Sequence, residues 1–211
     1  MRKMNFFAGP SVMPVEVLKK MEENIFDFEG QGLSMVEASH RGGMFEKMYD
    51  ECLASFRELL GIPCYPKLAD VPDEIDMAII STPAHTVLEK LEQCVDKKVK
   101  ATVVFTSGFA EAGPEGAALQ QRMTELAQKN DLRILGPNCV GIVNLSKSVM
   151  ACFANIVDLQ PVYPMTFGFV TQSGAFGTMI FSQAVESGVG FNAFVSVGNE
   201  ADTEFADYLA Y

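Results

Sequence analysis

From residue 76 onward, short apolar runs alternate with segments whose apolar residues recur at helical spacing. The runs have the length of buried strands and predict strands at 76–80, 101–106, 133–135, 166–171 and 193–197. The periodic segments predict helices at 87–95, 115–129, 174–186 and 203–211. We expect the stretch between the third and fourth strands to be irregular. This alternation is typical of the α/β class, with a doubly wound parallel sheet covered on both faces.

The first 63 residues follow a different pattern, with helical spacing and almost no strand signal. Pro14 suits the first turn of a helix, and apolar residues follow it at helical intervals. Gly30 and Gly32 interrupt the pattern, and a second helix is predicted between Phe45 and Leu60. The N-terminal part is therefore predicted to be a helical arm, with a loop around residues 39–41.

Composition excludes several classes of function. A formal net charge of −11 without a run of Lys or Arg argues against binding to nucleic acid or to an anionic membrane surface. No apolar run reaches the roughly 18–20 residues that span a bilayer. Five cysteines without a CxxC pair favour reduced thiols and a cytoplasmic protein. The only histidines, His40 and His85, lack metal-ligand spacing, so we expect no metal site.

The loops that follow the predicted strands are the candidate ligand site. Right-handed crossovers bring such loops to one edge of a parallel sheet, which is where α/β proteins bind ligands. These loops combine Gly with small and hydroxyl residues, so backbone N–H groups can approach a ligand closely. We therefore expect this edge to hold a phosphate-bearing ligand. The loops are 81–84, 106–109, 136–139, 171–174 and 197–200.

Three positions leave alternatives open from the residues alone. Ser173 opens a helix whose free N–H groups suit an anion, but capping of that helix is the more common role. Cys139 ends a strand and could face a ligand, yet most single cysteines are small buried residues. His40 and Arg41 offer donors for a phosphate or carboxylate, and a solvated loop explains them equally well.

Five motifs between residues 64 and 211 carry a resemblance to a known family. They are CYPKLADVPDEIDMAIISTPA, VVFTSGFAEAGPEG, RILGPNCVGIVN, FVTQSGAFG and FVSVGNEAD. In this order and spacing they resemble the NDP-forming acyl-CoA synthetases, which include the α chain of succinyl-CoA synthetase. The resemblance implies an acid–thiol ligase that works through an acyl phosphate. It also implies a Rossmann-like CoA-binding domain at 64–160 and the beginning of a flavodoxin-like domain at 161–211.

The same resemblance assigns coenzyme A as the cofactor and suggests which residues would hold it. The residues that would border CoA are Ser81, Thr82, Pro83, Ser107, Gly108 and Phe109, with Asn138 and Cys139 near its thiol end. The residues that would face the phosphate of a catalytic histidine are Gln172, Ser173, Gly174 and Ala175. By this analogy, phosphate contact becomes the favoured role of Ser173.

Residues 1–63 resemble another family through NFFAGPSVMPVEVL, FEGQGLSMVEASHR and FRELLGIP. These motifs are similar to the N-terminus of phosphoserine aminotransferase, the pyridoxal-phosphate (PLP) transaminase of serine biosynthesis. In that family the His-Arg pair, here His40 and Arg41, helps to bind the substrate phosphate, often across a dimer interface. The PLP lysine would lie well downstream, so we do not expect PLP to bind.

Each resemblance ends before its family's chemistry is complete. The synthetase part does not include that family's first strand, its Gly-rich turn or its phosphohistidine, because the only histidine after residue 63 is His85. We therefore assign no catalytic residue. We expect a CoA- or acyl-CoA-binding fragment that depends on an ATP-grasp β chain or domain. An aminotransferase fragment and a non-functional chimeric or truncated product, joined near residues 61–66, are the alternatives. The acyl group and the oligomeric state stay open.

Overall fold

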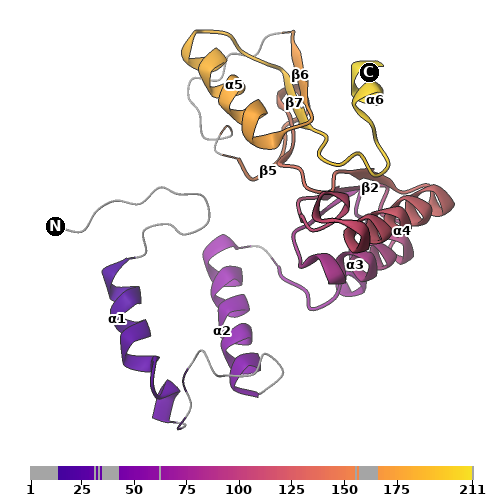
Figure 1. Ribbon diagram of the computed structural model, residues 1–211. Coiled ribbons are helices and arrows are strands. Elements are labelled where there is room, and N and C mark those ends of the chain that lie inside the picture. The colour runs from indigo at the N-terminus through magenta and orange to yellow at the C-terminus, as the bar shows by residue number, and fades with distance from the viewer. Residues whose placement is uncertain are drawn as a thin grey trace. The chain divides into compact units, whose positions relative to one another are not determined.

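The computed structural model describes residues 14–30, 32, 34, 43–61, 63–154, 156 and 166–210. The chain divides into two compact units, Met1–Cys64 and Tyr65–Tyr211 (Figure 1). Of the helices described, none is both long enough and apolar enough to cross a membrane.

The first unit contains the two helices that the sequence predicts. They are α1 (Val15–Asn24) and α2 (Gly43–Leu60), with a short 3-10 turn at Phe28–Gly30. The carbonyl oxygen of Pro14 accepts the first helical hydrogen bond of α1, from the N–H of Leu18 at 3.2 Å. Gly30 has a φ of +76°, a left-handed conformation that suits glycine and turns the chain after the 3-10 segment. The His40–Arg41 pair lies outside the described residues.

The second unit begins with a three-stranded parallel sheet in the order β1-β2-β3. Its strands are β1 (Met77–Ile80), β2 (Ala101–Val104) and β3 (Arg133–Leu135), joined by α3 (Ala84–Asp96) and α4 (Pro114–Asn130). Each helix forms the crossover between two neighbouring parallel strands, and the strand order advances in one direction. Both helices therefore lie on the same face of the sheet, where they pack against each other. Val104 and Ile134 point to that face, where they meet Leu91 of α3 and Met123 of α4.

The other face of this sheet is covered by a second sheet. That sheet has the order β5-β4-β7-β6, with strands β4 (Gly141–Asn144), β5 (Val149–Cys152), β6 (Gly168–Thr171) and β7 (Ala193–Ser196). Val103 and Leu135 of the first sheet share a buried cluster with Val195 and Val197. The α/β class and the parallel sheet are thus confirmed, while strands take the place expected of helices on the second face.

The hairpin β4–β5 corrects the prediction of an irregular stretch after the third strand. β6 and β7 are parallel, but β4 runs antiparallel to both β5 and β7. Each hairpin strand has only four residues, which is too short to show a clear period of two in the sequence. The turn between them is closed by the side chain of Asn144, which accepts from the N–H of Lys147 at 3.1 Å.

Two helices complete the second unit, α5 (Gly174–Glu186) and the short α6 (Phe205–Ala210). Phe181 of α5 packs against Phe194 of β7 in an edge-to-face arrangement, with ring centroids 5.6 Å apart. Both rings belong to a buried cluster with Val143. The predicted strand and helix after residue 166 are therefore confirmed as a packed β-α-β unit.

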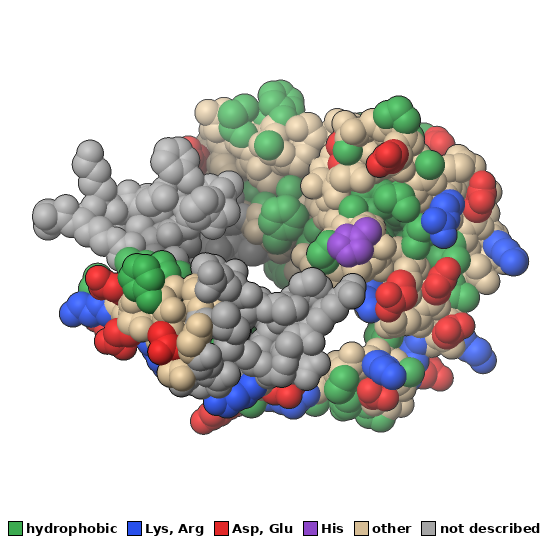
Figure 2. Space-filling model, turned by 60° about the horizontal axis from the view of Figure 1, so that its bottom comes forward, with side chains coloured by type: hydrophobic (Ala, Val, Ile, Leu, Met, Phe, Trp, Pro, Cys, Tyr) green, Lys and Arg blue, Asp and Glu red, His purple; other side chains and the backbone are tan. Residues whose placement is uncertain are grey.

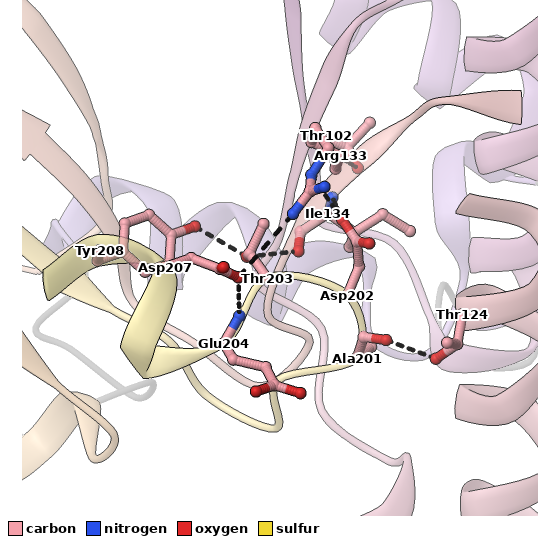
Figure 3. A network of polar contacts seen from close by, with 10 residues as sticks. All are labelled: Thr102, Thr124, Arg133, Ile134, Ala201, Asp202, Thr203, Glu204, Asp207 and Tyr208. Carbon is pink, nitrogen blue, oxygen red and sulfur yellow. Dashed lines mark hydrogen bonds and ion pairs between the residues drawn. The ribbon is translucent and has the colours of Figure 1, made fainter. Parts of the chain in front are cut away.

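The segment between β7 and α6 covers the free edge of β3 (Figure 3). Thr203 directs both its N–H and its hydroxyl to the carbonyl oxygen of Ile134, at 3.2 and 2.8 Å. Asp202 accepts from the N–H of Ile134 at 2.9 Å and pairs with Arg133 at 3.2 Å. This segment therefore satisfies the outer backbone groups of β3 as a neighbouring strand would.

Candidate functional site

The loops after the first three strands are joined by hydrogen bonds. The hydroxyl of Thr106, after β2, donates to the carbonyl oxygen of Thr82, after β1, at 2.6 Å. The backbone N–H of Asn138, after β3, donates to the carbonyl oxygen of Thr106 at 2.9 Å. Asn138 can sit in this position because it adopts a φ of +57°, which asparagine tolerates better than most residues.

The loops after β7 and β6 continue this chain of contacts. The N–H of Asn199 donates to the carbonyl oxygen of Pro137 at 2.9 Å. The side-chain amide of Gln172 donates to the carbonyl oxygen of Gly198 at 3.0 Å. A Cβ on Gly198 would lie only 2.2 Å from the carbonyl oxygen of Pro137, so the loops after β7 and β3 are in direct backbone contact. All five candidate loops therefore meet at one edge of the second unit.

An open pocket of about 610 Å³ lies between the loops that follow β1 and β2. Its volume falls in the range usual for small-molecule sites. Phe105 and Phe153 form an edge-to-face pair with ring centroids 4.9 Å apart, and both line the pocket together with hydroxyl side chains. The complete lining is Ser81, Thr82, Pro83, Ala84, Phe105, Thr106, Ser107 and Phe153. Four of the residues assigned to CoA thus share one concave surface.

Phe109 lies in the core and not at the pocket. Its side chain is fully buried, in the same cluster as Val87 and Leu91. Gly116 permits this, because a Cβ there would lie 1.9 Å from the carbonyl oxygen of Phe109. Any ligand contact from Phe109 would have to come from its backbone.

Cys139 is also buried, with 3% of its surface exposed. Its thiol donates to the carbonyl oxygen of Val104 at a sulfur–oxygen distance of 3.4 Å. Burial raises the pKa of the Cys139 thiol to about 12, so the thiol stays protonated at neutral pH. The structural environment is that of a small buried residue, which is the alternative favoured from the residues alone.

Ser173 caps the helix α5. Its hydroxyl oxygen accepts from the N–H of Phe176 at 3.3 Å, which is the geometry of an N-cap. Gly174 and Gly177 let this end of the helix approach its neighbours, since a Cβ on either would lie within 2.5 Å of Val140 or Thr171. Contact between Gln172, Ser173, Gly174, Ala175 and a phosphate stays a prediction.

Glu111 and Asn199, to which the sequence analysis gave no role, contact each other at the loop edge. Glu111 accepts hydrogen bonds from the N–H groups of Gly108 and Phe109, at 2.5 and 3.2 Å, and from the side chain of Asn199. Burial acts to raise the pKa of the Glu111 carboxyl, but these hydrogen bonds outweigh it and hold the pKa below its usual range. Glu111 is therefore an anion at neutral pH.

The lining of the pocket carries no charged side chain, and charges of both signs are present on the surface (Figure 2). Figure 2 shows acidic and basic side chains interspersed over the face that it presents. No Lys or Arg belongs to the lining of the pocket between β1 and β2. Within the described ranges, no group of three or more His, Cys, Asp or Glu side chains lies close enough to hold a metal ion.

Two family models match the chain. Residues 54–144 match a CoA binding domain, and residues 164–211 match a succinyl-CoA ligase like flavodoxin domain. The first match begins within α2, eleven residues before the second unit, and includes the motif FRELLGIP.

Curated relatives resemble most of the chain. It is 38% identical over 156 residues to the ADP-forming acetate–CoA ligase I of Archaeoglobus fulgidus, which covers 74% of the chain and 22% of that protein. It is 39% identical over 154 residues to the α subunit of the ADP-forming acetate–CoA ligase II of Pyrococcus furiosus, with 73% and 33% covered. The chain thus spans a third or less of the length of these relatives.

A solved structure and a third relative complete the comparison. The apo form of the dinucleotide-forming acetyl-coenzyme A synthetase 1 of Ca. Korarchaeum cryptofilum matches with a TM-score of 0.67 and 33% identity, over 82% of this chain and 39% of that one. Over 63 residues, the chain is 51% identical to the phosphoserine aminotransferase of Bacteroides fragilis, covering 30% of the chain and 18% of that protein.

Residues 54–144 therefore belong to the CoA-binding domain family, and with residues 164–211 they make this chain a relative of NDP-forming acyl-CoA synthetase α subunits.

Proposed function

We propose that the second unit binds coenzyme A or acyl-CoA in the pocket between the loops that follow β1 and β2. The observation that carries this proposal is the pocket of about 610 Å³ itself, whose lining residues other than Phe153 lie within the matched CoA-binding segment and include Ser81, Thr82, Pro83 and Ser107. Asn138, next along the edge, is the proposed contact near the thiol end of CoA.

The chemistry of the lining suits a ligand with both polar and apolar parts. Hydroxyl groups of Ser81 and Ser107 can donate to phosphate or carbonyl oxygens, and the rings of Phe105 and Phe153 offer an apolar wall to the pantetheine or adenine. The pocket also adjoins the first turn of α3, whose N–H groups favour negative charge. Without a lining Lys or Arg, binding here would depend only weakly on salt.

We propose that the protein to which these domains contribute synthesises acyl-CoA through an acyl phosphate. The loop 172–175 at the start of α5 would meet the phosphate, and an ATP-grasp chain or domain would supply the nucleotide-binding module. A reducing, cytoplasmic location is part of the proposal, because Cys52, Cys94, Cys139 and Cys152 carry thiols and not disulfides.

Ligand-induced stabilisation tests the proposed CoA site. Ser107 is an exposed residue of the pocket lining, and replacing it by tyrosine would fill the pocket without disturbing the core. We expect CoA at about 100 times its Kd to stabilise the wild-type protein by about 2.7 kcal/mol, and S107Y to show far less stabilisation. The measurement is the unfolding midpoint as a function of CoA concentration.

The matched control is S146Y, a change at an exposed serine in the β4–β5 turn. This variant should respond to CoA as the wild-type protein does. No shift of the wild-type midpoint at millimolar CoA would refute the proposed binding, and an unchanged response of S107Y would refute the proposed pocket.

We also propose that the chain joins sequence from two families. The aminotransferase-like arm would be residues 1–63, followed by the CoA-binding domain at 64–160 and the flavodoxin-like part at 161–211. The observation that favours the arm is the 51% identity over 63 residues. The motif FRELLGIP is part of the aminotransferase-like pattern and also lies inside the CoA-binding match. Because both patterns contain this motif, a junction near residues 61–66 would leave both of them intact. Phosphate binding by His40 and Arg41 is part of this proposal.

A further inference from the structure

Asn199, in the loop after β7, uses every polar group that it has. Its N–H donates to the carbonyl oxygen of Pro137 at 2.9 Å, and its carbonyl oxygen accepts from the side chain of Gln120 at 3.2 Å. Its side-chain nitrogen donates to Gln120 at 3.0 Å and to the carboxylate of Glu111. Its side-chain oxygen accepts from the amide of Asn138 at 3.3 Å. One side chain therefore connects α4 with the loops after β2 and β3.

The partners of Asn199 hold the backbone beside the proposed CoA pocket. Glu111 accepts from the N–H groups of Gly108 and Phe109, the two residues that follow Ser107 of the pocket lining. Gln120 accepts from the N–H of Ala110 at 3.2 Å. Three consecutive backbone N–H groups of this loop are thus bound by two side chains, and both of those side chains are oriented by Asn199.

Only an amide can serve all of these partners. The side chain at this position donates to the acceptors Glu111 and Gln120 and accepts from the donor Asn138. An aspartate would lose both donated bonds and would place a second carboxylate against Glu111, which is an anion at neutral pH. The loop at 107–111 would then lose its present support.

We propose that Asn199 is a positioning residue for the CoA pocket. None of its hydrogen bonds given above involves a lining residue of the pocket, and it acts by fixing the Glu111 and Gln120 side chains that hold the loop at 108–110. This inference rests on the proposed CoA binding. It adds that residues from the flavodoxin-like part set the shape of a site that lies in the CoA-binding part.

The backbone of the Asn199 loop has anchors that do not involve its side chain. The N–H of Ala201 donates to the carbonyl oxygen of Gly136 at 3.0 Å, and the hydroxyl of Thr124 donates to the carbonyl oxygen of Ala201. A change of the Asn199 side chain alone therefore leaves the loop attached, so an N199D variant should fold.

The experiment compares CoA affinity, measured by calorimetry, in four proteins at a temperature where all are folded. We expect N199D to weaken CoA binding by about tenfold, since it removes hydrogen bonds and adds a repulsion at the loop. The double variant E111Q/N199D should recover most of the affinity. A glutamine at position 111 still offers an oxygen to the loop N–H groups, and its amide can donate to the new carboxylate.

N192D is the matched control, because it makes the same change at an asparagine whose amide contacts Ser146. It should bind CoA as the wild-type protein does. Equal affinity of N199D and N192D would overturn the proposal, and so would a loss in N199D that E111Q fails to recover.

Hydrogen exchange separates this inference from the proposed function. Without CoA, the N–H groups of Gly108 and Phe109 should exchange at least about tenfold faster in N199D than in N192D, because their acceptor is displaced. If the wild-type protein binds no CoA, the proposed function fails, but this exchange still tests whether Asn199 positions the loop. Unchanged exchange in N199D would overturn the positioning role itself.

Discussion

Cys139 illustrates how position in the core determines the chemistry of a thiol. A reactive cysteine needs a stabilised, accessible thiolate, whereas the Cys139 thiol is buried and donates to the carbonyl oxygen of Val104. Burial raises its pKa to about 12, from 9.0 for an unperturbed thiol. Cys139 is best understood as packing that supports Asn138, its exposed neighbour at the loop edge.

The raised pKa of Cys139 predicts a loss of stability in alkaline solution. Between pH 9 and 12 the unfolded chain releases this proton while the folded protein keeps it, so the free energy of unfolding falls as the pH rises through that range. We expect C139A to flatten this part of the stability profile, measured by urea unfolding from pH 7 to 10.5. C52A, at an exposed cysteine, should keep the wild-type slope, and an unchanged slope in C139A would contradict the prediction.

Single residues were predictable from the sequence where their partners are close in the chain. Capping of α5, the role favoured for Ser173 from the residues alone, needs only the N–H of Phe176, three residues later. Glu111 and Asn199 are 88 residues apart, and nothing local marks either of them. The only hint was that both lie in loops that follow strands. Pairing of this kind depends on how the two sheets pack, which a single sequence does not encode in any short pattern.

At the scale of elements, the sequence predicted the long and strongly periodic ones. Helices α4 and α5 agree with their predictions to within a residue at either end. The hairpin β4–β5 was missed because two strands of four residues give too little alternation. The covering of β3 by the segment after β7 was also invisible, because side chains replace strand hydrogen bonds there (Figure 3).

The segment that covers β3 should contribute measurably to stability. The hydroxyl of Thr203 donates to the carbonyl oxygen of Ile134 and accepts from the hydroxyl of Tyr208 at 2.8 Å. Replacing Thr203 by valine keeps the shape and the backbone N–H but removes two hydrogen bonds, the one from the hydroxyl to Ile134 and the one from Tyr208, so we expect T203V to lose about 1–3 kcal/mol in urea unfolding. T178V removes a hydroxyl that bonds only within α5 and should lose clearly less. Equal losses would show that the covering segment adds nothing.

At the scale of the whole molecule, the buried clusters and the proposed CoA pocket lie in only one of the two units. Every residue of the three buried clusters lies between Leu68 and Tyr208, and so does every residue that lines the proposed CoA pocket. The first unit, Met1–Cys64, carries the aminotransferase resemblance and the His40–Arg41 pair. The second unit therefore contains the whole lining of the proposed CoA pocket, and the first unit is not expected to contribute to it.

This division predicts that residues 65–211 fold and bind CoA without the arm. Because the core clusters and the pocket lie wholly inside the second unit, the Kd for CoA should stay within about threefold of that of the full chain, a difference of less than about 0.7 kcal/mol. The family match begins at residue 54, so a fragment of residues 54–211 serves as the control that keeps the whole matched segment. If 54–211 binds CoA and 65–211 does not, the last turns of α2 belong to the functional domain, and the division at Cys64 does not mark its boundary.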